Sequence, residues 1–201
     1  MSKLASRSAL YGIAKPGRFG KADGDAGVTI AERTGLGLAT IAVRKGQEGG
    51  LKASVRETYG VELPLASSVA KGNDMGFIGT GPGQWLVVSG VLGHETLAEE
   101  LATTLKGLAS ISDQSSGRAV IRISGPRARD VLAKGLGIDL DPRVFVGGSA
   151  ATSIISHMGV LVWREDETES YHVALFRSGA DSFWRWLTAS AAQFGYEVTA
   201  S

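Results

Sequence analysis

The three histidines of the chain, His94, His157 and His172, are its first candidates for metal binding or proton transfer. No two of them are three or four residues apart, so no helix would present the paired imidazoles of a metal site. His157 and His172 fall on neighbouring strand-like runs and could meet across a sheet, where such a pair is more often structural. The chain has no cysteine, which excludes thiolate zinc sites, cysteine-ligated clusters, disulfides and a cysteine nucleophile.

Acidic side chains gather at Glu165, Asp166, Glu167 and Glu169. Their spacing is typical of a solvated turn between two strands rather than of an acid–base pair. Glu99 and Glu100 lie on the polar side of a leucine-faced helical window. The residues therefore predict no catalytic constellation and no metal site.

Two glycine-rich segments could bind phosphate. Gly35-Leu36-Gly37 precedes a strand instead of following one, and Thr40 stands where a dinucleotide loop needs its third glycine. The segment from Gly79 to Gln84 lacks the Lys-Ser/Thr of a P-loop, and Pro82 removes a backbone amide. We expect a hairpin turn there, and no cofactor-binding residue in either segment.

The C-terminal half is biased toward arginine over lysine and holds Trp163, Trp184 and Trp186. Arginine and tryptophan are enriched where proteins contact one another, whereas lysine is depleted. We therefore predict a partner interface that includes Arg177, Trp184, Trp186 and Trp163. The alternatives are that Arg177 pairs internally with Asp181 and that the tryptophans cover the core.

The last helical window runs over 183–194 and ends at Gly195. Phe183, Leu187, Ala191 and Phe194 share one face at 3.6 residues per turn, and Trp184 and Trp186 flank that face. Ser178 followed by Asp181 fits a capping box at its start.

Apolar periodicity predicts the remaining elements. Glycines close helical windows at Gly60, Gly107 and Gly135, as expected of left-handed C-terminal residues. Strand-like runs alternate with these windows; they cover 38–43, 76–79, 85–89, 109–113, 119–124, 152–158, 160–164, 171–176 and 196–199.

The element order is similar in the two halves. Gly60-Val61-Glu62-Leu63-Pro64 follows the first helix of one half, and Gly137-Ile138-Asp139-Leu140-Asp141-Pro142 follows that of the other. We predict an α+β protein with two ferredoxin-like βαββαβ-type lobes in one compact unit. The predicted division is an N-terminal arm or loop over 1–34, a first lobe over 35–113 and a second lobe over 114–201.

The composition is that of a folded protein, because 43% of the 201 residues are hydrophobic and 20% are charged. A net charge of +1 gives no strong field for nucleic acid or an anionic membrane. No apolar run is long enough to span a bilayer. The basic N-terminus is interpreted as an arm, with a transit peptide as the alternative.

Several segments resemble the gamma subunit family of heterotetrameric sarcosine oxidase. They are Gly79–Leu86, Asp113–Arg118, Ile123–Leu132, Ile138–Leu140, Ala151-Thr152, and Arg177-Ser178 with Ala180, Phe183-Trp184 and Trp186-Leu187. The resemblance covers about Leu36 to Gly195. Ser124-Gly125-Pro126 and its following helix are shared more widely, with folate-binding aminomethyltransferase-type proteins.

This resemblance implies a folate-binding-domain-like fold in a cytoplasmic complex with alpha, beta and delta subunits. The complex would demethylate sarcosine oxidatively to glycine, yielding hydrogen peroxide and methylenetetrahydrofolate or formaldehyde. FAD, FMN, NAD and tetrahydrofolate would belong to the large subunits and zinc to the smallest. The gamma chain itself is implied to be non-catalytic and free of cofactor, with a structural or assembly role.

Two alternatives remain open. One is a free-standing folate-dependent one-carbon protein of the aminomethyltransferase or iron–sulfur-repair type. Lys45-Gly46 followed by Gln47-Glu48 resembles the repair signature but lacks its cysteine. The other is an interaction module with no enzyme partner.

Overall fold

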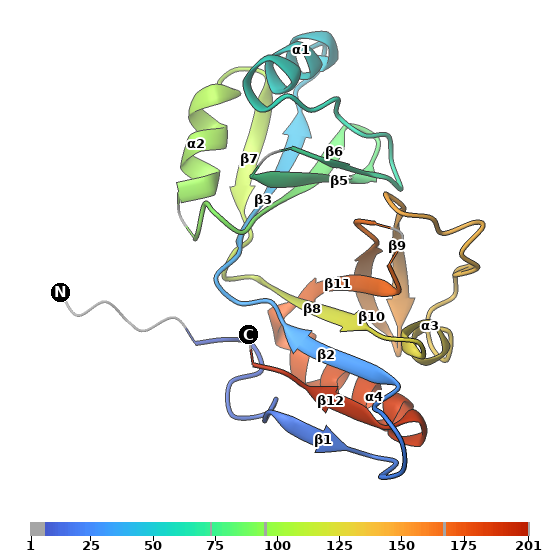
Figure 1. The fold of residues 1–201 in the computed structure, drawn as a ribbon. Helices are drawn as coiled ribbons and strands as arrows, with labels where there is room; N and C mark the ends of the chain where they lie inside the picture. The colour runs from blue at the N-terminus through green and yellow to red at the C-terminus, as the bar shows by residue number, and fades with distance from the viewer. Residues whose placement is uncertain (1–6, 73, 95, 167, 201) are drawn as a thin grey trace, which may run out of the picture.

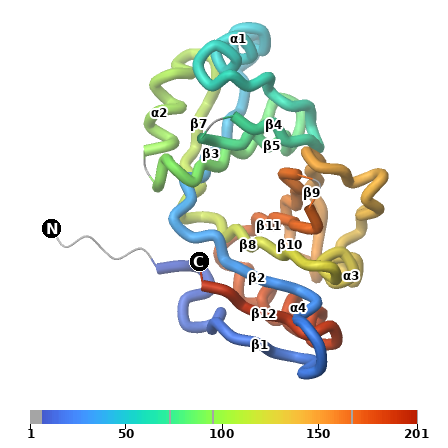
Figure 2. Tube along the Cα trace, viewed as in Figure 1, coloured from blue at the N-terminus to red at the C-terminus, as the bar shows by residue number. Residues whose placement is uncertain are grey.

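The computed structural model describes residues 7–72, 74–94, 96–166 and 168–200. Two lobes lie one above the other, each built from a sheet with helices on its outer side (Figure 1). The chain crosses between the lobes after residue 32 and again after residue 113, and the first and last described residues belong to the lower lobe (Figure 2). The predicted α+β fold with two lobes is confirmed.

The first lobe contains a five-stranded sheet in the order β4-β5-β6-β3-β7. Its elements are β3 (Gly37–Val43), α1 (Glu48–Tyr59), β4 (Val69–Lys71), β5 (Met75–Gly81), β6 (Gln84–Ser89), α2 (Thr96–Thr104) and β7 (Ala109–Asp113). Leu51 and Val55 of α1 and Leu97 and Leu101 of α2 are buried in this lobe's core. Their spacing of four residues places each pair on one helix face.

The second lobe repeats this element order. Its elements are β8 (Arg118–Ser124), α3 (Ala128–Leu132), β9 (Ala150–Ile155), β10 (Met158–Trp163), β11 (Ser170–Phe176), α4 (Ala180–Ala191) and β12 (Tyr196–Val198). A seven-stranded sheet has the order β1-β12-β2-β8-β11-β10-β9. The strand neighbours match those of the first lobe, except that β2 lies between β8 and β12 and that β1 is added beyond β12. This common order, one strand longer than βαββαβ, supports the predicted duplication.

The segment expected to be an N-terminal arm contains two strands, β1 (Gly17–Phe19) and β2 (Val28–Glu32). β2 pairs with β8 and β12, and Val28 and Ile30 are fully buried. Alternate burial along β2 follows the period of two of a strand. The structure therefore differs from the expected arm or loop over 1–34 at these two strands, because the Gly- and Asp-rich residues before Val28 obscured a short strand.

The prediction of a single strand over 152–158 is wrong. β9 ends at Ile155 and β10 begins at Met158, with a two-residue turn between them. Ser156 and His157 have φ of 47° and 67°, which is the left-handed conformation that tight hairpin turns require.

The expected capping box at Ser178 is also wrong. Arg177–Gly179 form a 3₁₀ turn, and α4 begins at Ala180 without a side-chain cap. Asp181 instead pairs with Arg185 at 2.8 Å across one helical turn. The 3₁₀ turn connects β11 to α4, so the residue that directly precedes the helix is Gly179 and not Ser178.

The two sheets pack against each other through a third core. The first lobe contributes Leu36, Leu38, Ile78 and Leu86, and the second contributes Val120, Ala150, Leu161, Trp163 and Ala174. Helices α1 and α2 cover the outer side of one sheet, and α3 and α4 cover that of the other. The central layer is therefore sheet on sheet.

Candidate functional site

A cleft of about 230 Å³ lies between the lobes at the edge of this central layer. Its apolar lining includes Leu36, Ile78, Val88 and Trp163, most of which belong to the interlobe core. Charged side chains form its rim, namely Arg33, Lys71, Asp74 and Glu165. The cleft is thus an apolar notch with a polar mouth.

Glu165 connects the two lobes at this mouth. Its carboxylate lies 3.2 Å from Lys71 Nζ of the first lobe and 3.6 Å from His172 Nε2 of the second. The Trp163 indole also donates to it. Burial would raise the pKa of Glu165, but His172, Lys71 and Trp163 together hold that pKa below its usual value.

His172 is a buried histidine on β11, with only 5% of its surface exposed. Its ring stacks on Trp163, with centroids 5.1 Å apart and planes at 16°. Burial lowers the pKa of His172 to about 4, against the opposing effect of Glu165 and with help from Arg33 and Arg122. The imidazole is therefore neutral at physiological pH, and its Nδ1 has no hydrogen-bond partner among the described residues.

The two strand histidines do not pair as the sequence allowed. His172 lies opposite Trp163 and Arg122 in the sheet, whereas His157 occupies the exposed β9–β10 turn. Among the residues that the structure describes, no group of three or more His, Asp or Glu side chains could hold a metal ion. Of the acidic turn, Glu167 lies outside the described residues.

The cleft does not fit the folate that the fold family implies. Ligand pockets are usually about 300–1,000 Å³, and this notch is smaller. Leu36, Ile78 and Trp163 are at most 6% exposed, so their side chains already fill the sheet interface on this side of the cleft.

The glycine-rich segments have structural roles. A Cβ at Gly37 would overlap the carbonyl oxygen of Leu92, and a Cβ at Gly79 would overlap that of Leu65. Pro82 and Gly83 form the turn between β5 and β6, as predicted. Both segments allow close backbone approach.

The four residues expected at an interface lie in different surroundings. Trp163 is 2% exposed in the interlobe core, and Trp184 is 8% exposed in the core beneath α4. Trp186 is half-buried against that same core and contacts Gly135. Arg177 is half-exposed and donates to the carbonyl oxygens of Arg7 and Ser8, at 2.6 and 3.0 Å. Their contact with a partner stays a prediction.

A second hollow, of about 340 Å³, collects four arginines, Arg7, Arg33, Arg118 and Arg177. Residues 113–117 connect the lobes and place Arg118 at the start of β8. Within this connection, Ser115 Oγ accepts from the Leu38 N–H at 2.9 Å and donates to Asp113 at 2.7 Å. The sequence pointed to Arg177 and to the arginine bias of the C-terminal half, but not to this cluster. Sheet pairing brings its members together from distant segments, and Arg7 and Arg33 lie outside the biased half.

No described helix is long and apolar enough to cross a membrane.

Comparisons with known proteins give one consistent result. The family model described as the sarcosine oxidase, gamma subunit family matches residues 45–193. Sarcosine oxidase subunit gamma of Corynebacterium sp. (strain P-1) is 29% identical over 181 residues, covering 89% of this chain and 88% of that protein. The same subunit of Corynebacterium sp. (strain U-96) is 29% identical over 181 residues, covering 85% and 82%.

Solved structures show the same fold. A chain of heterotetrameric sarcosine oxidase from Corynebacterium sp. U-96 superimposes with a TM-score of 0.80 at 24% identity, covering 95% of this chain and 97% of that one. The glycine cleavage system aminomethyltransferase T of Bartonella henselae gives 0.65 at 12% identity, with 95% and 57% covered.

Proposed function

Because this chain belongs to the sarcosine oxidase, gamma subunit family, we propose that it is the gamma subunit of a heterotetrameric sarcosine oxidase and catalyses no step itself. The observation that carries the proposal is the family match over residues 45–193. The matched gamma subunits correspond to this chain over most of their own length. The complex would be the oxidoreductase, and this chain would have a structural role in it.

The described side chains support a non-catalytic role. The pair formed by the buried His172 and the more exposed Glu165 is the arrangement closest to an acid–base site, but Lys71 and Trp163 already bind Glu165. A general base must reach a substrate proton. The cleft beside this pair is small and its inner lining is apolar, so it offers little room for a substrate. Glu165 therefore links Lys71 of the first lobe to His172 of the second, which supports a structural role for the pair.

The cofactors of the complex would lie in other subunits. We propose that FAD, FMN, NAD, tetrahydrofolate and zinc are held by the alpha, beta and delta subunits, and that these subunits are the partners of this chain. Support comes from the hairpin geometry of 79–84, the position of Gly35-Leu36-Gly37 at the start of β3, and the misfit of the cleft to folate. A cytoplasmic location is part of the same proposal.

The free-standing one-carbon protein is not favoured. The aminomethyltransferase T structure is 12% identical and extends well beyond this chain, which covers 57% of it. The gamma subunits instead correspond to this chain nearly end to end.

Purification of the affinity-tagged chain from its native host tests the proposal. We expect large flavin-bearing chains to co-purify, with sarcosine-dependent hydrogen peroxide formation in the complex. The tagged chain expressed alone should show neither flavin absorbance nor activity. A chain that purifies without partners from its host, or that oxidises sarcosine alone, would overturn the proposal.

A further inference from the structure

We propose that the hollow lined by Arg7, Arg33, Arg118 and Arg177, hereafter the arginine hollow, binds a carboxylate-bearing acidic segment of a partner subunit. The inference rests on the proposed function, because the partner is taken to be another chain of the complex. It adds which surface is contacted and by what chemistry.

The arginine hollow carries an excess of positive charge. Glu32 is the one carboxylate in its described lining, and backbone amides already occupy it. Its Oε1 accepts from the Ala9 N–H at 2.7 Å, and both oxygens accept from the Leu10 N–H at 3.3 Å. None of the four guanidinium groups forms an ion pair with a described carboxylate. Among the described residues, therefore, no carboxylate neutralises these guanidiniums by direct pairing.

Arg118 shows the strongest need for a partner. Burial lowers the pKa of its guanidinium, and its buried Nε has no hydrogen-bond partner among the described residues. Removing a charge from water is costly unless an opposite charge or hydrogen bonds compensate. An incoming carboxylate would supply both to the guanidinium, since Arg–carboxylate pairs form directional, charge-assisted hydrogen bonds.

An exposed aromatic ring accompanies this charge. The Arg118 guanidinium lies 4.9 Å from the centroid of the Phe176 ring, and Phe176 is 59% exposed at the end of β11. Stacking fixes the plane of the guanidinium and leaves its edge for a ligand. Arginine beside an exposed aromatic is a typical composition for the centre of a protein interface.

The wall of the hollow is ordered by internal contacts. Arg177 donates to the carbonyls of Arg7 and Ser8, and Glu32 holds the amides of the next two residues. Arg7 in turn lies over the Tyr11 ring at 5.2 Å. Arg177 is therefore a positioning residue that keeps Arg7 at the rim. Preorganisation of this kind reduces the entropy lost on binding.

Protein carboxylates fit the hollow better than nucleic acid does. Nucleic-acid binding usually needs a basic stripe that follows many phosphates, whereas this chain has a net charge of +1 and one compact hollow of about 340 Å³. A short run of Asp or Glu side chains on a partner loop matches that size and charge.

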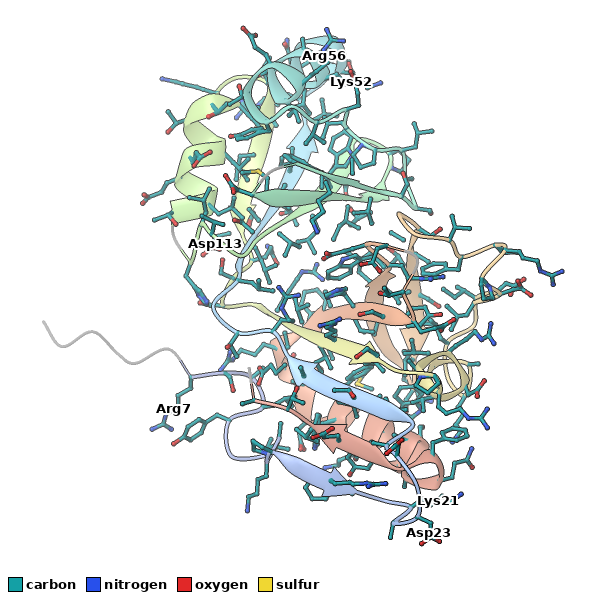
Figure 3. All side chains as sticks on the ribbon, in the orientation of Figure 1. Arg7, Lys21, Asp23, Lys52, Arg56 and Asp113 are labelled. Carbon is teal, nitrogen blue, oxygen red and sulfur yellow. The ribbon has the colours of Figure 1, made fainter. Side chains whose placement is uncertain are left out.

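Charge reversal within the reconstituted complex tests the proposal. The double variant Arg33→Glu/Arg118→Glu reverses two guanidiniums from different segments. The control Lys52→Glu/Arg56→Glu makes the same net change on α1, at the far end of the molecule from Arg7 (Figure 3). We expect the hollow variant to weaken assembly at least about 30-fold, as for the loss of buried charge pairs, and the control to assemble normally.

A second, charge-conserving variant keeps the test valid if the charge-reversal variant fails to fold, and it identifies the partner segment that occupies the hollow. Arg33→Lys/Arg118→Lys keeps the charge and offers amines to a zero-length carbodiimide cross-linker. Mass spectrometry of the cross-linked complex should find these lysines joined to Asp or Glu of another subunit.

Three results would overturn the inference. The first is normal assembly of a folded hollow variant. The second is a lack of cross-links from the lysines to partner carboxylates in the assembled complex. The third is binding of free glutarate to the hollow without any effect on assembly. The last result would assign the hollow to a small anion. If the unaltered chain assembles with no partner, the proposed function itself fails, so the two failures are distinguishable.

Discussion

Ser68 and Ser149 occupy the same position in the two lobes and pair with each other in an antiparallel bridge. Each precedes the strand that follows its lobe's first helix, β4 in one case and β9 in the other. The bonds are reciprocal, since the Val69 N–H donates to Gly148 at 2.7 Å and the Ala150 N–H donates to Ser67 at 2.9 Å. Self-pairing of equivalent residues is the arrangement that an approximate two-fold axis produces.

The first prediction concerns Gly148, whose carbonyl accepts one of these bonds. Its φ of +83° is a conformation that costs an L-residue about 1–2 kcal/mol. We expect Gly148→Ala to lower the free energy of unfolding by that amount in urea titrations. Gly49→Ala is the matched control, because Gly49 lies within α1 with open space around it. It should leave stability unchanged or raise it by about 0.5 kcal/mol; equal losses in both variants would contradict the prediction.

The second prediction compares two glycines of one strand, β5. A Cβ at Gly79 would overlap the backbone of Leu65, whereas a Cβ at Gly76 would meet nothing within 4 Å. Gly79→Ala should therefore cost roughly 1–3 kcal/mol, as overpacking does, while Gly76→Ala should be neutral or slightly stabilising. Denaturant midpoints measure both. A tolerated Gly79→Ala would show that the loop carrying Leu65 can move away.

Local signals were sufficient for much of the fold. Gly60, with φ of 67°, ends α1, and the leucines of α2 face the core of the first lobe. Both features could be predicted because they depend on residues only a few positions apart. β2 was harder to predict, since it is held by β8 and β12, which follow it by roughly 90 to 170 residues. β4, of three residues, has too few residues for a periodic pattern.

The candidate sites depended on such long-range pairing even more. Arg33 and Arg118 come from different segments and meet because β2 pairs with β8. The sequence grouped Trp163 with Trp184 by type alone, and the structure places them in separate cores. Residue type indicated the chemistry, while the sheet order determined which residues share a surface.

The third prediction is a loss of stability in mild acid that depends on His172. Its pKa is about 4 in the folded chain and about 6.5 when unfolded. Between these values the unfolded chain takes up a proton that the folded chain does not, so stability falls as pH falls. The contribution should be about 2 kcal/mol between pH 7.5 and pH 5. The depressed pKa of Glu165 acts in the same direction below its usual range.

Urea unfolding at several pH values measures this effect in His172→Phe, which keeps an aromatic ring beside Trp163 but cannot titrate. The variant should lose less stability between pH 7.5 and pH 5 than the unaltered chain does. His157→Asn is the control, because His157 is exposed in a turn whose left-handed backbone asparagine tolerates. A pH slope unchanged in His172→Phe would exclude His172 as its source.

The last prediction separates the two interpretations of Trp184. The side chain is 8% exposed and packs in the core beneath α4, so truncation should leave a cavity. We expect Trp184→Ala to lower the free energy of unfolding of the subunit by about 3–5 kcal/mol. Trp186→Ala is the comparison, because Trp186 is only partly buried against the same core and its loss should cost the isolated subunit less.

Thermal unfolding of the free subunit, measured beside assembly with partner chains at low temperature, distinguishes a core role of Trp184 from an interface role. If Trp184 is instead an interface hot spot, unfolding would be nearly unchanged while assembly weakens by about 2 kcal/mol or more.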